Sequence, residues 1–227
     1  MGTTGNLAAR AGREALERAL IDPCQVDMLV LCTSTPDLQI PATSAMVASE
    51  LGVRGGVVDL NAACAGFVYG LIVGAGLIAG GMNRVLLIGA ETMSRMVDWS
   101  DRSTAFLFGD GAAAVLLEGV HDRGSLLGWN LGVDGSFADL LYAERGSSLV
   151  MKGQEVFRNA VRMAVESSTV AMERAGITAS DVDLFVPHQA SARLMESVTA
   201  RLGLRPAQLA SMIERTGTRQ PLRSRWP

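Results

Sequence analysis

One stretch constrains this chain more than any other: a short apolar strand, a turn of small residues that contains Cys64, and a glycine-rich apolar helix. Residues 57–60 are rich in β-branched side chains, which is typical of a buried strand. Residues 67–79 are apolar and long enough to form a helix. A thiol at such a junction lies beside the free N–H groups of a helix start, which lower a thiol pKa and favour a nucleophile. The other interpretation of Cys64 is a small buried core thiol.

Helical and strand patterns alternate along the rest of the chain, which indicates an α/β layered fold. A tight turn is expected at residues 109–111. A strand, a polar turn and a helix also surround His188, so the second half contains a counterpart of the Cys64 unit, and two such halves commonly form an active site at their junction. Helices are predicted at 4–20, 43–51, 155–175 and 192–202, and strands at 26–32, 57–60, 84–88, 112–117, 124–132 and 182–186.

Composition excludes several classes of protein. With 48% hydrophobic residues, 19% charged residues and a net charge of −3, the chain has a globular composition and no electrostatic case for nucleic acid or an anionic membrane. The three cysteines, Cys24, Cys32 and Cys64, have no metal-like spacing, and their odd number suggests a reducing compartment, so we expect a cytoplasmic protein without a metal. The start shows no signal-peptide pattern, and the most apolar stretch is too short to span a membrane.

The two histidines have different surroundings. His121 lies in a polar turn, where a solvated side chain is expected. His188 follows an apolar strand and precedes a helix. It is either a hydrogen-bonded histidine at a strand end, or a base or hydrogen-bond donor beside Cys64.

Four motifs then occur in an order that resembles a known family. The chain is similar to β-ketoacyl-acyl-carrier-protein synthase III, a condensing enzyme of the thiolase fold, over residues 3 to about 216. The resemblance implies a thiolase-like fold of two pseudo-repeated halves, residues 1–119 and 120–216, in layered α-β-α-β-α architecture. The motifs are Asp59-Leu-Asn-Ala-Ala-Cys64-Ala-Gly-Phe, Phe108-Gly-Asp-Gly-Ala-Ala, Met151-Lys-Gly-Gln-Glu-Val-Phe-Arg and Val186-Pro-His188-Gln-Ala.

The resemblance also implies a reaction. Cys64 would take an acyl group from acyl-CoA as a thioester, and His188 with a partner Asn would stabilise the enolate formed when malonyl-acyl-carrier protein loses carbon dioxide. That carbanion would attack the thioester to give a β-ketoacyl product. The scheme needs no metal or redox cofactor. Its partners would be acyl-CoA, the acyl carrier protein and a second copy of the chain in a homodimer.

Three further residues match substrate-binding positions of the family. Ile40 matches a residue at the end of the primer pocket, which one copy of the dimer contributes to the pocket of the other. The alternative is an apolar loop residue that packs locally. Arg193 matches a basic residue that faces CoA or the carrier protein, and Arg102 one that faces the CoA nucleotide. A solvated surface arginine is the alternative for both. Ser191 stands where the family usually has Asn.

The sequence departs from the family at both ends. The family's first strand and loop would precede residue 1, and residues 217–227 form a basic tail without apolar periodicity in place of the Gly-Asn-Thr-Ser motif that supplies the partner Asn. Synonymous codons for residues 216–227, read one base out of frame, can encode that motif, which suggests a one-base loss near Thr216. The sequence therefore leaves two alternatives open: an acyltransferase of the same fold without decarboxylation, and an inactive fragment.

Overall fold

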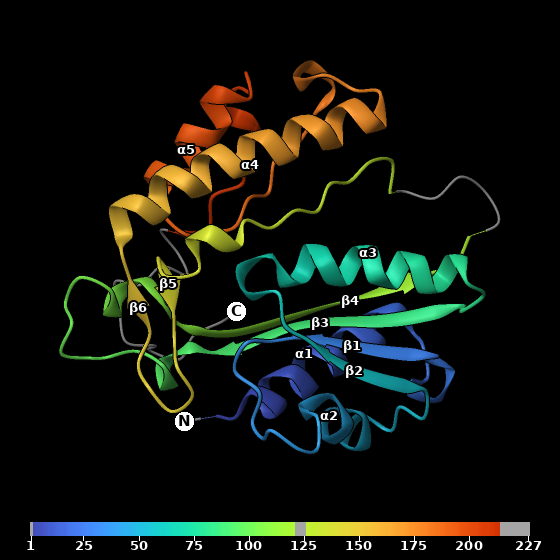
Figure 1. Ribbon diagram of the computed structural model, residues 1–227. Helices are drawn as coiled ribbons and strands as arrows, with labels where there is room; N and C mark the ends of the chain where they lie inside the picture. The colour runs from blue at the N-terminus through green and yellow to red at the C-terminus, as the bar shows by residue number, and fades with distance from the viewer. Residues whose placement is uncertain (1, 121–125, 214–227) are drawn as a thin grey trace. The chain divides into compact units, whose positions relative to one another are not determined.

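The protein is described by a computed structural model that covers residues 2–120 and 126–213. These residues form two compact units (Figure 1). The first contains residues 1–94 and 110–126, and the second contains residues 95–109 and 127–227. The loop 95–109 thus belongs to the second unit, although it lies within the half predicted as residues 1–119.

The first unit is a mixed sheet of four strands in the order β2-β1-β3-β4. Strands β1, β2 and β3 are parallel, and β4 is antiparallel to β3. Because the three parallel strands end at the same edge, the segments that follow them gather there. The strands are β1 (Met28–Cys32), β2 (Gly56–Leu60), β3 (Arg84–Thr92) and β4 (Asp110–Glu118).

Helices cover both faces of this sheet (Figure 1). Helices α1 (Thr4–Ala19) and α2 (Thr43–Leu51) pack on one face, and α3 (Gly66–Ala79) packs on the other. The side chains of neighbouring strand residues alternate between the two faces, as strand geometry requires. Leu29, Leu31, Leu86 and Ile88 lie in the core under α1 and α2, whereas Val30, Cys32, Val85 and Leu87 lie in the core under α3.

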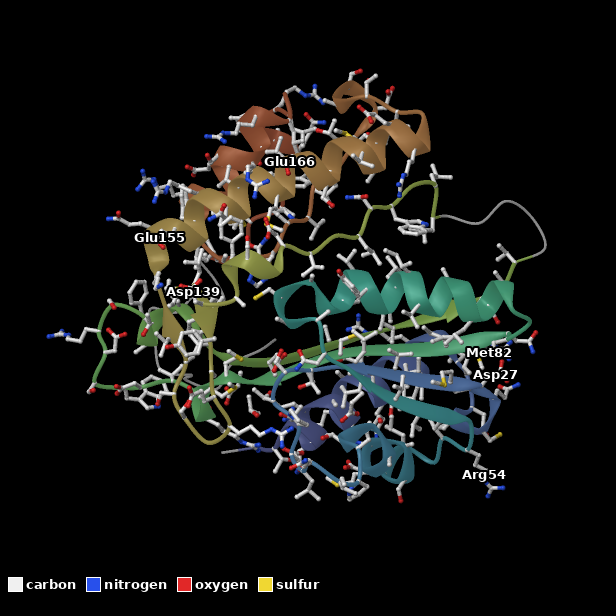
Figure 2. The ribbon with its side chains drawn as sticks, in the orientation of Figure 1. Asp27, Arg54, Met82, Asp139, Glu155 and Glu166 are labelled. Atoms are coloured by element: carbon white, nitrogen blue, oxygen red, sulfur yellow. The ribbon has the colours of Figure 1, made fainter. Side chains whose placement is uncertain are left out.

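Carboxylates fix the ends of these elements. Asp59, in the Cys64 motif, accepts the Thr43 and Ser44 N–H groups at 2.8 and 2.7 Å and so caps the start of α2. Asp27 accepts the N–H groups of Asn83 and Arg84, which lowers the pKa of its carboxyl group. Asp27 is labelled beside Met82 in Figure 2, at the amino end of β1.

The second unit is mainly helical in its described part. Helix α4 (Gly153–Ala175) packs against α5 (Ala192–Arg201), with Val161, Met195 and Val198 buried. The strands β5 (Leu141–Tyr142) and β6 (Val150–Met151) pair antiparallel before α4.

Two predicted strands of this unit are wrong. Residues 126–132 form no strand, and 124–125 lie outside the described residues. The segment runs along α4 instead: the Asn130 amide donates to Ser167 Oγ at 3.0 Å, and the Arg174 guanidinium donates to the Trp129 carbonyl at 2.7 Å. Residues 182–186 make only one bridge, between Phe185 and Leu209, because no other described segment pairs with them.

The remaining elements agree with the sequence to within a few residues at their ends. One exception is the expected turn at 109–111, because Asp110 and Gly111 already belong to β4. Residues 135–146, for which no helix or strand is predicted above, hold β5 and a short 3-10 turn at Gly135–Phe137.

Candidate active site

Cys64 lies at the carboxyl edge of the sheet, in the 3-10 turn η2 (Ala63–Ala65) between β2 and α3. Ala63 has a φ of 47°, a left-handed conformation that costs a residue with a side chain roughly 1–2 kcal/mol. The Asn61 side-chain oxygen accepts the Ala63 N–H at 3.2 Å and holds this turn. The predicted placement of Cys64 between a strand and a helix is confirmed.

The environment of the Cys64 thiol differs from the expectation. The residue is exposed, yet surrounding protein desolvates the sulfur, and this raises the pKa of the thiol above its ordinary value of 9.0. The negative charge of Glu91 adds to the rise, and a backbone hydrogen bond opposes it more weakly. The pKa is therefore raised where a lowering was expected, because desolvation and the Glu91 charge outweigh the backbone hydrogen bond. A thiolate at this position needs a group that accepts the proton.

His188 belongs to the second unit and lies in the loop before α5. The neighbouring Gln189 fixes this loop: its amide donates to the Ala210 carbonyl at 3.1 Å, and its oxygen accepts the Met212 N–H at 2.9 Å. Although His188 is exposed in the second unit, desolvation lowers the pKa of its imidazole below 6.5. The ring is consequently neutral at pH 7 and has a nitrogen free of a proton.

Arg193 lies on α5 above a ring of α4. Its guanidinium carbon is 5.2 Å from the centre of the Phe157 ring, a cation–π contact. The two residues line a shallow pocket of about 480 Å³ together with Gly153, Gln154 and Arg158. Ser191, two residues earlier, accepts the Leu194 N–H at 3.2 Å and caps α5, which gives this serine a structural role.

Ile40 and Arg102 are both exposed. Ile40 is 84% exposed in the first unit, so the alternative that it packs locally in its loop is wrong. Arg102 lies in the 95–109 loop of the second unit.

The predicted residues are thus divided between the units: Cys64 and Ile40 in the first, and His188, Arg102 and Arg193 in the second. Their pairing across the units stays a prediction. His121 and the tail from Gly217 lie outside the described residues.

Sequence reasoning missed Glu91 and Asn61 beside Cys64, and Gln189 beside His188. A glutamate at the end of an otherwise apolar strand was the available signal for Glu91. The contacts of Asn61 depend on the folded turn and leave no such pattern.

Within residues 2–120 and 126–213, no group of three or more His, Cys, Asp or Glu side chains is placed to hold a metal ion. No helix in the same part of the chain is both long and apolar enough to cross a membrane.

Known proteins resemble this chain in sequence. Residues 58–135 match the family described as 3-oxoacyl-[acyl-carrier-protein (ACP)] synthase III, and residues 172–219 match its C-terminal region. The β-ketoacyl-[acyl-carrier-protein] synthase III of Cereibacter sphaeroides ATCC 17023 is 48% identical over 213 residues, which cover 88% of this chain and 66% of that protein. The corresponding protein of Brucella suis is 41% identical over 229 residues, with 95% and 71% covered.

The fold matches as well. The crystal structure of 3-oxoacyl-[acyl-carrier-protein] synthase III from Aquifex aeolicus superimposes with a TM-score of 0.92 at 36% identity, covering 95% of this chain and 71% of that one. The chain spans about two thirds of the length of the curated relatives it matches. It has the thiolase-like α/β fold, and it belongs to the β-ketoacyl-[acyl-carrier-protein] synthase III family.

Proposed function

We propose that the chain is the acyl-transferring part of a β-ketoacyl-acyl-carrier-protein synthase III that starts fatty-acid or polyketide synthesis. The observation that carries this proposal is the presentation of Cys64 at the carboxyl edge of the sheet, on a strained turn, in a member of this family. The proposed substrates are acyl-CoA and malonyl-acyl-carrier protein. The proposed setting is a cytoplasmic homodimer that needs no metal or redox cofactor.

The first step is acyl transfer. The Cys64 sulfur attacks the thioester carbon of acyl-CoA, the bond from that carbon to the CoA sulfur breaks, and CoA leaves with a proton. Since the pKa of the thiol is raised, the sulfur must lose its proton to a base as it attacks. The neutral imidazole of His188 is the proposed acceptor, and its lowered pKa keeps it available at pH 7.

The second step is condensation. Malonyl-acyl-carrier protein loses carbon dioxide, His188 and a partner Asn stabilise the enolate oxygen, and the carbanion attacks the Cys64 thioester. Arg193 is proposed to face the carrier protein or CoA, because its guanidinium is held over Phe157 beside an open pocket. Arg102 is proposed to face the CoA nucleotide, and the exposed Ile40 to close the primer pocket of a partner copy.

One observation favours a related function, acyl transfer without decarboxylation. The sequence has Thr218 after Gly217, at the position where the resemblance places the partner Asn. A chain with Cys64 and His188 alone would form the acyl thioester and pass it to water or another acceptor without decarboxylation.

Acylation of Cys64 tests the proposal. The purified chain is incubated with acetyl-CoA and digested, and the mass of the Cys64 peptide is measured by mass spectrometry. We expect an acetyl group on Cys64, no acetyl group on Cys24, which is also exposed, and no acylation in Cys64→Ala. An unmodified Cys64 peptide contradicts the proposal and supports an inactive fragment.

Release of carbon dioxide separates the two functions. Because one missing oxyanion donor costs on the order of 10²–10³ in rate, we expect little malonyl-dependent condensation from this 227-residue chain. Ready condensation by this chain would show that the partner Asn is not needed. Acylation without carbon dioxide release, also in a chain extended to the length of its relatives, would favour the related acyltransferase.

A further inference from the structure

The Glu91 carboxylate is held at the edge of the sheet where Cys64 lies. One carboxylate oxygen accepts the Ser34 N–H at 2.7 Å. The other accepts the Thr35 hydroxyl at 2.6 Å and the Thr33 hydroxyl at 3.4 Å. Thr33 and Thr35 are themselves buried, so the end of β3 is tied to the residues that follow β1. A negative charge is thereby fixed at one position.

A second set of contacts leads from the same place to the Cys64 turn. The Ser34 hydroxyl donates to the Asn61 side-chain oxygen at 3.3 Å, and the same oxygen accepts the Ala63 N–H at 3.2 Å. Ala63 is the residue with left-handed φ directly before Cys64. Asn61 therefore connects the Ser34 loop to the strained residue that aims the thiol.

We propose that Glu91, Ser34 and Asn61 are positioning residues of Cys64: Glu91 holds the backbone of Ser34, and Ser34 and Asn61 fix the turn that presents the thiol. The Glu91 charge raises the pKa of the Cys64 thiol in addition to desolvation. Proton removal is then coupled to the arrival of the base, and the resting thiol reacts slowly with other electrophiles. The inference rests on the proposed function only for the role of Cys64 as acyl carrier.

The charge is tested with Glu91→Gln, which keeps the side-chain shape and an acceptor oxygen. Alkylation of Cys64 by iodoacetamide is followed between pH 6.5 and 9.5 by peptide mass spectrometry. We expect the midpoint of the pH profile to fall and the rate at pH 7.5 to rise roughly three- to tenfold, because removing the negative charge favours the thiolate. The exposed Cys24, read in the same digest, should keep its profile.

Glu118→Gln is the matched control. Glu118 lies at the end of β4 and pairs with Arg84 at the start of β3, away from the Cys64 edge. An unchanged Cys64 rate in Glu91→Gln, or an equal change in Glu118→Gln, overturns the electrostatic role. Glu91→Asp, which keeps the charge, should keep the high midpoint, and a fall there also contradicts it.

The turn is tested separately with Asn61→Ala, which removes the acceptor of the Ala63 N–H. We expect acylation of Cys64 by acetyl-CoA to slow roughly tenfold or more, because the sulfur is no longer held in position to attack the acyl carbon. The midpoint of the alkylation profile should not change. Asn61→Ser should restore most of the rate, because a serine oxygen can accept the N–H two residues later. Full activity in Asn61→Ala overturns the positioning role.

The alkylation test of Glu91 and the acylation test of Cys64 can fail independently of each other. If wild-type Cys64 is not acylated, the proposed function fails, whereas the alkylation profile still decides the role of Glu91. If Glu91→Gln loses its fold by circular dichroism, a fall of the midpoint in Glu91→Asp still contradicts the electrostatic role, and Asn61→Ala still decides the role of the turn.

Discussion

At the scale of single residues, burial decides what each thiol can do. Cys32 ends β1 and is 4% exposed in the core beneath α3. Burial raises the pKa of its thiol from 9.0 to about 11, with a smaller rise from the charge of Glu91. Cys32 is accordingly an inert core thiol, the interpretation that the sequence also left open for Cys64.

The raised pKa of Cys32 predicts a loss of stability in alkali. A folded thiol that ionises near pH 11 is fully stabilising below the unfolded pKa of about 9, and this stability is lost as the pH rises from about 9 towards 11. We expect Cys32 to account for about 2 kcal/mol of lost unfolding free energy by pH 10.5. Urea unfolding of wild type and Cys32→Ala at pH 7.5 and 10.5 measures it.

The comparison between the two pH values removes the cost of the small cavity in Cys32→Ala, which does not depend on pH. The variant should lose less stability between pH 7.5 and 10.5 than wild type, by the amount above. Equal losses in the two proteins would contradict the assignment to Cys32.

At the scale of elements, the contact of α3 with the sheet depends on a stripe of glycines. Gly66, Gly70 and Gly74 are the buried residues of α3 and face the sheet. A Cβ at Gly70 would lie 2.5 Å from Leu87 Cδ1 and 2.6 Å from Cys32 Sγ. The helix that follows Cys64 can approach the strands this closely only without side chains there.

Gly70→Ala should therefore destabilise the protein by about 2 kcal/mol, because the added methyl overpacks the core. Gly76 lies on the same helix with nothing within 4 Å of its Cβ position. Gly76→Ala should be stabilising by about 0.5–1 kcal/mol, since alanine favours a helix and restricts the unfolded chain. Urea midpoints of both variants measure the contrast, and similar effects at the two positions would refute close packing of α3.

Elements with strong local patterns were predictable, and those that depend on distant partners were not. Residues 57–79 contain a short apolar strand, a turn of small residues and an apolar helix in direct succession. Local sequence patterns therefore predict the strand, turn and helix around Cys64. Residues 126–132 and 182–186 are apolar, but a strand also needs a neighbour to pair with. The raised pKa of Cys64 comes from desolvation in the folded protein and, second, from Glu91, which is 27 residues away in the sequence.

At the scale of the whole molecule, the tail carries a prediction about the gene. If one base was lost near Thr216, the shifted frame should encode Gly-Asn-Thr-Ser immediately after this point. Nucleotide sequencing of residues 210–227 and the bases that follow decides this. A shifted frame that encodes another sequence would leave the related acyltransferase as the better interpretation of the chain.

The exposed apolar side chains predict how the 227-residue chain behaves in solution. Phe67 and Val68 on α3 are 43% and 48% exposed, and Val186 beside His188 is 69% exposed. Exposed apolar side chains promote association and bind apolar dyes. We expect the chain to bind anilinonaphthalene sulfonate and to form mixed oligomers in sedimentation velocity at micromolar concentration. A frame-corrected chain extended to the length of its relatives should instead bind little dye and sediment as a dimer. A monomeric, dye-free 227-residue chain would show that these side chains are covered within one copy, and Ile40 would then have no partner copy to enter.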